Sequence, residues 1–270
     1  MKLNLDKEIT VIIILYKTPE KRISNLKQYK DFKLIILDQG SDNNSKKRIK
    51  NILGFDFTYY YSKKNLGLSK GINFLIKKTK TKYCMITEPD VFISKKSILN
   101  LKKNIKSNKN FLITSPNFKK NKKAERFKIL DKIDLSCVLF ETKKMINFNF
   151  YDEDFFFFWT DIDFIKRVNE SNFKMIESRN AAAKHLVSKS SNMTMYLKFL
   201  RDKSYKYGEL IYDYKYNKLR FLKILRQLIQ TFIRTLFYFL IFDKKNFSRN
   251  IGYFVGLINF LFFYLKKLII

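Results

Sequence analysis

The stretch YCMITEPD, residues 83–90, is an apolar run that ends in two carboxylates on either side of a proline. We expect a strand over residues 83–87, because a strand buried on both faces of a sheet forms a near-continuous apolar run. In open α/β sheets, ligands bind in the crevice beyond the carboxyl ends of the strands. Glu88 and Asp90 follow such an end, and their oxygens suit Mg²⁺ or Mn²⁺ holding a diphosphate. The stretch therefore predicts a hard-cation site at the sheet edge, and its alternative interpretation is an ordinary acid-Pro-acid loop.

Apolar runs and helical patterns alternate on both sides of this stretch. The expected strands cover residues 9–15, 33–37, 57–61, 111–115 and 135–140, and the expected helices include 68–78, 94–106 and 161–170. Strands that alternate with helices form a parallel sheet with right-handed crossovers. The sequence therefore predicts an α/β fold with a mostly parallel central sheet flanked by helices.

Composition narrows the class of protein. The 270 residues fit one large domain, or one domain with an appendage, and 46% of them are apolar, which is enough for a packed core. Cys84 and Cys137 lie in apolar runs without a paired-thiol spacing, so we expect buried free thiols in a reducing compartment. With these two cysteines and a single histidine, a zinc site built on His and Cys is excluded.

The formal net charge of +31 implies attraction to an anionic partner such as nucleic acid, a membrane face or a phosphorylated substrate. The lysines are scattered along the chain, whereas a nucleic-acid-binding protein concentrates them on one helix or stripe. Compositional drift in a lysine-rich, asparagine-rich chain explains the charge equally simply. Residues 1–8 are polar and carry no apolar signal segment, so we expect the catalytic part to face the cytoplasm.

The composition changes after about residue 218. Apolar residues between Phe221 and Phe237 recur at helical spacing, with Lys223, Arg226 and Arg234 on the other face. Such a helix suits a membrane surface, and docking on the catalytic domain is the alternative. Residues 251–265 are nearly all apolar but fewer than the roughly 20 that a membrane span needs. We expect an in-plane or shallowly inserted helix there, with a tilted span as the alternative.

Residues that could carry chemistry follow the expected strands in a fixed order. They are Tyr16, Thr18, Asp38, Asn65, Gly67, Asn73, Glu88, Asp90, Trp159, Thr160, Asp161, Asp163 and His185. The segments that contain them are ITVIIILYKTPE, LIILDQGSDN, NLGLSKGINFLI, YCMITEPDVFIS, YDEDFFFFWTDIDFIKRV and AAAKHL, between residues 9 and 187. In this order, the series resembles the family 2 glycosyltransferases with the GT-A fold, especially their rhamnosyltransferase-like branch from bacterial surface-polysaccharide synthesis.

The resemblance implies an enzyme that moves a sugar from a nucleoside-diphosphate sugar to a hydroxyl of a glycan acceptor, which we expect to be lipid-linked. Residues 1–217 would form the GT-A domain, and residues 218–270 a helical membrane-associating tail. The enzyme would work at the cytoplasmic face of the inner membrane, with no specific nucleic-acid partner.

For the donor, the resemblance places Tyr16 and Thr18 in the base and ribose pocket and gives Asp38 a hydrogen bond to the base. Asn65, Gly67 and Asn73 belong to the same donor site by their place in the motif order. Asp90 would bind Mg²⁺ or Mn²⁺ together with His185, and Glu88 would lie near the sugar or ribose.

For the acceptor, the resemblance makes Asp161 the general base of an inverting transfer. Trp159, Thr160 and Asp163 would line the acceptor side, with a helix-start carboxylate as the alternative role of Asp163. Residues 188–191 and 201–207 could bind phosphate or could belong to a solvated basic helix.

The family usually has Asp or Asn where this chain has Glu88, and Glu where it has Thr160. These departures leave a catalytically degenerate scaffold at the membrane as an alternative function. A basic nucleic-acid-binding protein is a further alternative, although it does not explain buried strands that end in acids.

Overall fold

The computed structural model describes residues 6–40, 42, 44–119, 125–186 and 194–269. The chain forms two compact units, which are described separately. The first contains Met1–Tyr151 and Phe164–Asn192, and the second contains Asp152–Asp163 and Met193–Ile270. Residues 188–191, for which phosphate binding and a solvated basic helix were the alternatives, lie outside the described residues.

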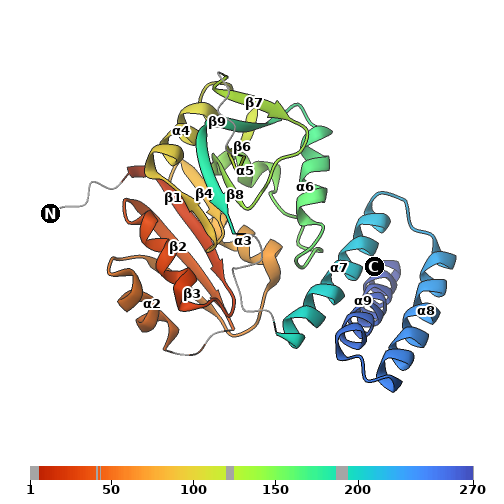
Figure 1. The fold of residues 1–270 in the computed structure, drawn as a ribbon. Coiled ribbons are helices and arrows are strands. Elements are labelled where there is room, and N and C mark those ends of the chain that lie inside the picture. Colours follow the sequence, from red (N-terminus) through yellow and green to blue (C-terminus); the bar gives the residue numbers. More distant parts are fainter. Residues whose placement is uncertain (1–5, 41, 43, 120–124, 187–193, 270) are drawn as a thin grey trace. The chain divides into compact units, whose positions relative to one another are not determined.

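A mixed sheet forms the centre of the first unit, in the order β3-β2-β1-β4-β8-β6-β9-β5, with β7 paired to β9 (Figure 1). The strands are β1 (Asp6–Leu15), β2 (Phe32–Gln39), β3 (Thr58–Ser62), β4 (Tyr83–Thr87), β5 (Val91–Ile93), β6 (Phe111–Asn117), β7 (Phe127–Leu130), β8 (Cys137–Glu141) and β9 (Lys174–His185). The helices of this unit are α1 (Glu20–Ile23), the 3-10 helix η1 (Ser24–Tyr29), α2 (Ser45–Leu53), α3 (Gly67–Lys78), α4 (Lys95–Ile105), α5 (Thr142–Phe148) and most of α6 (Thr160–Asn169).

Helices cover both faces of the sheet, and β1 explains why its sequence is a continuous apolar run. Ile9, Val11 and Ile13 pack in one core with α2, α4 and η1, whereas Ile12 packs in a second core with α3, α5 and α6. Alternate residues of a strand point to opposite faces, so both sets must be apolar. The fold class expected from the sequence is confirmed.

The directions of the strands were harder to predict from the sequence than their positions. The pairs β1–β2, β1–β4 and β2–β3 are parallel, as the strand–helix alternation predicts. However, β8 runs antiparallel to both β4 and β6. Strands buried on both faces look alike in sequence whichever way they run, so the apolar run at 135–140 revealed a strand but not its direction.

Helix α3 lies unusually close to the sheet because of one glycine. A Cβ on Gly71 would come within 2.6 Å of Ile14 Cδ1 and 3.3 Å of Leu37 Cδ2, closer than real side chains pack. A larger residue there would force the ends of the Ile14 and Leu37 side chains to move. The start of α3 is therefore held near the ends of the strands that precede the candidate site.

The second unit contains α7 (Met195–Lys215), α8 (Phe221–Leu240), α9 (Lys244–Ile269) and the segment Asp152–Asp163. Its own core includes Phe155, Leu210, Ile224, Leu257 and Phe260. The expected boundary at 217/218 coincides with the connection between α7 and α8 and stays a prediction, because it falls inside this compact unit. Within the described residues, Lys244–Leu268 is long and apolar enough to cross a membrane, judged by length and composition alone.

Candidate active site

The parallel strands β1, β2 and β4 end at one edge of the sheet, and a cavity lies beyond the first two. Its volume is about 290 Å³. Thr18 and Asp38, both expected at a nucleoside pocket, line it, as do Lys17, Gly40 and Arg48. The ends of the strands and the first turns of α2 thus form a polar hollow.

Asp38 lies at the bottom of a hydrogen-bond cluster that sequence reasoning missed. The buried Asp38 Oδ2 accepts hydrogen bonds from Ser45 Oγ at 2.6 Å and from the Tyr59 hydroxyl at 2.9 Å. Burial and the neighbouring Asp38 charge raise the pKa of Tyr59 to about 12, so its hydroxyl keeps the proton that it donates. Ser45 starts α2 and Tyr59 lies on β3, the strand paired with β2, and no local sequence pattern marks either residue.

Tyr16 and Thr18 form the turn after β1. The Tyr16 backbone N–H donates to Thr18 Oγ1 at 3.3 Å, and Lys17 between them has a positive φ of 50°. Across the hollow, Gly40 has a φ of 72°, and a Cβ there would lie 3.2 Å from Tyr16 Cε2. The Tyr16 ring therefore packs against backbone at Gly40, a position where glycine is favoured.

Asn65 and Gly67 shape the entry to α3. Asn65 Oδ1 accepts the Gly67 backbone N–H at 2.9 Å, and Gly67 has a φ of 81°. Gln39 Oε1 accepts the Leu66 N–H at 2.6 Å, which ties this turn to the end of β2. The observed role of Asn65 and Gly67 is thus to fix a turn, and their contact with a donor stays a prediction.

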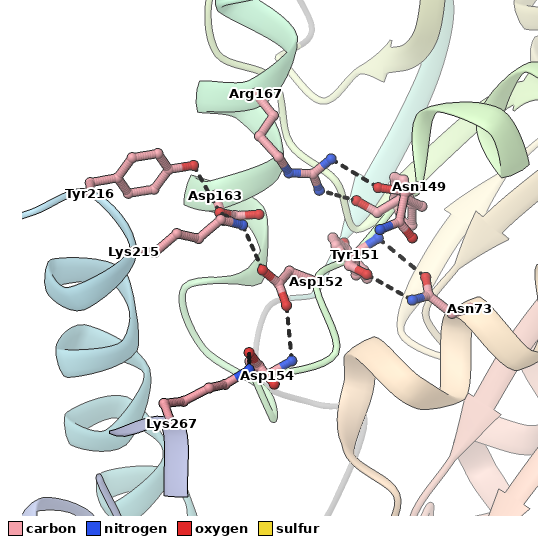
Figure 2. A network of polar contacts seen from close by, with 11 residues as sticks. Asn73, Asn149, Tyr151, Asp152, Asp154, Asp163, Arg167, Lys215, Tyr216 and Lys267 are labelled. Atoms are coloured by element: carbon pink, nitrogen blue, oxygen red, sulfur yellow. Dashed lines mark hydrogen bonds and ion pairs between the residues drawn. The ribbon is translucent and has the colours of Figure 1, made fainter. Parts of the chain in front are cut away.

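Asn73 holds the backbone of Tyr151. Its amide donates to the Tyr151 carbonyl at 2.7 Å, and its Oδ1 accepts the Tyr151 N–H at 3.2 Å (Figure 2). Arg167 fixes the same stretch by donating to the carbonyls of Asn149, at 2.9 Å, and Phe150. Because Asn73 is 6% exposed and engaged in both directions, it positions the chain before Asp152. Its expected contact with the donor stays a prediction.

Glu88, Asp90 and His185 come together although His185 is far away in the sequence. Strand β5 pairs antiparallel with β9 so that Val91 is opposite His185, and the Leu186 N–H donates to the Asp90 carbonyl at 3.1 Å. His185 Nε2 lies 3.5 Å from Glu88 Oε2 and 3.7 Å from Asp90 Oδ1. One ligand atom from each residue lies within 4.8 Å of the others.

The charges at this cluster favour a cation. Contacts with the carboxylates of Asp134, Asp90 and Glu88 raise the pKa of His185 to about 11. Nε2 is buried and has no hydrogen-bond partner within the described residues, although the two carboxylates lie 3.5 and 3.7 Å away. Two carboxylates and an imidazole are a donor set that Mn²⁺ accepts, and Mg²⁺ is satisfied by the carboxylates alone. The residues fit a divalent ion.

Asp134 supports the cluster from the other side of the imidazole and was missed in the sequence. Its Oδ2 lies 4.0 Å from His185 Nδ1, and its Oδ1 accepts the Ser136 N–H at 2.8 Å. Burial raises the pKa of Asp134, but the contact with His185 and the bonds from Ser136 lower it more. Metal-binding histidines commonly place their second nitrogen against a carboxylate. No motif marks Asp134, which lies in the irregular segment between β7 and β8.

In the second unit, the aromatic segment turns sharply into α6. Trp159 has a positive φ of 72°, and Thr160 Oγ1 donates to the Phe157 carbonyl at 3.2 Å. A Cβ on Gly208 of α7 would lie 2.7 Å from the Phe158 carbonyl oxygen and 2.9 Å from Trp159 Cδ1. Asp161 is exposed in the first turn of α6, and within the described part of the chain no side chain bonds its carboxylate. Its carboxylate is therefore available as a proton acceptor.

Asp163 differs from Asp161 because it is fully buried and ion-paired. Its Oδ1 lies 2.6 Å from Lys215 Nζ and accepts a hydrogen bond from the Tyr216 hydroxyl at 2.9 Å (Figure 2). Lys215 Nζ also lies 2.6 Å from Asp152 Oδ2. The first turn of α6 is thereby bonded to the end of α7. A role of Asp163 toward an acceptor stays a prediction.

Comparison with known proteins points to one family. The model of glycosyl transferase family 2 matches residues 11–169, which include all the candidate donor, metal and acceptor residues from Tyr16 to Asp163 but not His185. No curated protein matches the chain by sequence.

Two solved structures share the fold. The mannosyltransferase PcManGT from Pyrobaculum calidifontis, in complex with GDP-Man and Mn²⁺, is 12% identical with a TM-score of 0.57. That alignment covers 76% of this chain, which spans only 64% of the mannosyltransferase. Residues 1–349 of TarS from S. aureus are 11% identical with a TM-score of 0.53, and the alignment covers 91% of this chain and 90% of that one. Such low identities establish the GT-A-like fold alone, and a rhamnosyltransferase-like branch stays a prediction.

Proposed function

Since the chain belongs to glycosyl transferase family 2, an enzyme family of class EC 2.4, we propose that it transfers a sugar from a nucleoside-diphosphate sugar to a hydroxyl of a glycan acceptor. The observation that carries the proposal is the Glu88–Asp90–His185 cluster beside the strand ends that form the Asp38 cavity. The cluster supports binding of a metal and a diphosphate, and sugar release distinguishes an active enzyme from a scaffold that has lost catalysis.

The donor would bind at the carboxyl ends of β1, β2 and β4. The cavity lined by Thr18 and Asp38 suits a base and ribose, because its walls are polar and Asp38 is held rigid by Ser45 and Tyr59. Glu88, Asp90 and His185 would hold Mn²⁺ or Mg²⁺, which neutralises the charge of a leaving diphosphate.

Asp161 would take the proton from the acceptor hydroxyl. That oxygen forms the new bond to the anomeric carbon while the bond from that carbon to the diphosphate oxygen breaks. A base needs an accessible carboxylate, which Asp161 has and the buried, ion-paired Asp163 has not. Inversion at the anomeric carbon is part of the proposal through family membership.

The acceptor proposal is a lipid-linked glycan in surface-polysaccharide synthesis, extended at the cytoplasmic face of the membrane. Its support is the apolar, basic character of the second unit, and Trp159 and Thr160 would lie on the acceptor side. A donor of the rhamnosyl type belongs to the same proposal.

The test is release of nucleoside diphosphate from a panel of UDP-, GDP-, dTDP- and CMP-activated sugars, with and without Mn²⁺. We expect slow metal-dependent release from one nucleotide class, faster with a lipid-linked acceptor, and its loss in Asp90→Asn. A protein that binds one of these nucleotides but never releases the sugar would be the degenerate scaffold. Salt-sensitive binding to nucleic acid without nucleotide binding would favour the nucleic-acid-binding alternative.

A further inference from the structure

Helix α8 turns its apolar side away from the core of the second unit. Only Ile224 and Thr231 of this helix are buried. The exposed apolar residues are Phe221, Leu222, Leu225, Ile229, Phe232, Ile233, Leu236, Phe237, Phe239 and Leu240. Their exposed fractions run from 48% at Leu236 to 83% at Leu222, so the apolar side of α8 is open to solvent.

These residues form one continuous side of the helix. Successive residues are separated by about 100° around an α-helix, so the exposed apolar positions cover about half of its circumference, centred opposite Ile224 and Thr231. Over the 20 residues of α8 this makes an apolar strip roughly 30 Å long. A soluble monomer rarely leaves a contiguous apolar surface of this size uncovered.

A basic strip runs along one border of the apolar side. It contains Lys223, Arg226 and Arg234, all exposed, and α8 contains no acidic residue. Within the described residues, no ion pair or hydrogen bond engages Arg226 or Arg234. Lys223 is ion-paired with Glu209 and Asp213, so Arg226 and Arg234 are the cations left for anionic headgroups beside acyl chains that cover the apolar side. A protein partner would need an apolar groove edged with acids.

We propose that α8 lies in the plane of an anionic bilayer, with its apolar side among the acyl chains and Arg226 and Arg234 at the lipid phosphates. The proposal rests on the proposed function for the presence of a membrane, because a lipid-linked acceptor brings the enzyme to one. Beyond the proposed function, the proposal names α8 as the element that binds the membrane, gives its orientation in the membrane plane, and specifies anionic lipid.

Helix α9 supports an in-plane arrangement over a span. A Cβ on Gly256 would lie 2.6 Å from the Lys203 carbonyl oxygen, and one on Gly252 would lie 3.0 Å from the Phe199 carbonyl oxygen. The backbones of α9 and α7 are thus in direct contact, and α7 carries charged residues such as Asp202 and Lys206. A spanning α9 would have to leave α7 or take these charges into the hydrocarbon.

The test is flotation of the full-length protein with phosphatidylcholine vesicles, with or without about one third phosphatidylglycerol. Two substitutions, Ile229→Asp and Ile233→Asp, should lower the partition coefficient at least about tenfold, because charges would enter the apolar layer. The matched control carries Ile129→Asp and Ile146→Asp, which change equally exposed isoleucines of the first unit, and should bind like the wild type. Arg226→Gln with Arg234→Gln should weaken binding about 30-fold on anionic vesicles and little on neutral ones.

Four outcomes would overturn the proposal. In the first, the wild-type protein binds neither vesicle type; in the second, the control variant loses as much vesicle binding as Ile229→Asp with Ile233→Asp. In the third, the wild-type protein stays on the vesicles after an alkaline carbonate wash. In the fourth, the wild-type protein does not bind vesicles but forms a dimer that Ile229→Asp with Ile233→Asp dissociates. The carbonate result would indicate a span, and the dimer would make the face a contact between two copies. A nucleotide–Mn²⁺ thermal shift is measured on every variant. If the protein binds vesicles but shows no thermal shift, the proposed donor site is contradicted and the membrane role of α8 is not.

Discussion

Lys215 Nζ lies 2.6 Å from Asp163 Oδ1, and this ion pair bonds the last residue of α7 to the first turn of α6 (Figure 2). Asp163 is 0% exposed, and Lys215 is 28% exposed and also contacts Asp152 at 2.6 Å. The proposed base, Asp161, precedes Asp163 by two residues on α6. The pair therefore fixes the turn that presents the base.

Replacing Lys215 with Met should lower the free energy of unfolding by about 3 kcal/mol, because it removes the ammonium group that neutralises the buried Asp163 carboxylate. The rate of transfer should fall while the nucleotide dissociation constant stays unchanged, since only the position of Asp161 is affected. Chemical denaturation measures the stability and steady-state kinetics the rate of transfer. Lys215→Arg, which keeps the positive charge, should restore much of the stability and of the rate. Loss of transfer with unaltered stability would assign Lys215 a direct contact with substrate.

Replacing Asp161 with Asn should reduce transfer by about 10²- to 10⁴-fold, the usual contribution of a general base. Binding of nucleotide with Mn²⁺ should change less than about twofold. Asp154→Asn, an exposed aspartate of the same segment, is the matched control and should keep its activity. If Asp161→Asn retains transfer at nearly the wild-type rate, the base is another residue.

Replacing Asp134 with Asn should weaken Mn²⁺ binding by about 10- to 100-fold, because the carboxylate that orients His185 loses its charge. Calorimetric titration with Mn²⁺ measures this directly. Asp131→Asn changes a neighbouring exposed aspartate and should leave the affinity unaltered. Equal affinity in both variants would show that Asp134 does not support the cluster.

The ion pair between Lys102 and Asp6, the first residue of β1, should make the stability of the protein depend on pH. Burial raises the pKa of Asp6, but hydrogen bonds and the charge of Lys102, 2.8 Å away, lower it more. A lowered folded-state pKa gives stability that is present above the usual value of 3.8 and is lost as pH falls through the folded value. Lys102→Met should thus cost about 1 kcal/mol near neutral pH and little in strong acid. Lys103→Met is the control and should leave the free energy of unfolding unchanged at either pH. If Lys102→Met lowers it equally at both pH values, Lys102 stabilises the fold by packing and not by its charge.

Much of the first unit could be predicted because burial on both faces leaves a clear mark in sequence. The strand at residues 83–87 and the helices near 68–78 and 94–106 are confirmed with small shifts at their ends. Strands β5, β7 and β9 were missed. The first two are short, and β9 mixes buried and exposed residues without a strict alternation. The neighbours that complete the site, Ser45, Tyr59 and Asp134, come from strand register and loop path, which local patterns do not encode.

The periodicity of α8 predicted a helix, and the structure confirms one at Phe221–Leu240. The sequence could not show which side of α8 would be covered, because that depends on where α7 and α9 pack.

Asn73 is a second residue whose role the sequence alone could not show. An amide in a family motif reads as a ligand contact, yet here it satisfies both backbone groups of Tyr151.

The most direct test of the donor site is the thermal midpoint of the full-length protein with UDP, dTDP, GDP or CMP, each with and without Mn²⁺. A ligand that binds only the folded state raises the midpoint by mass action. We predict a rise that requires both one nucleotide and Mn²⁺, and that disappears in Asp90→Asn while the midpoint without ligand stays measurable. A rise that is equal without Mn²⁺, or no rise with any nucleotide, would contradict a metal-dependent donor site at Glu88, Asp90 and His185.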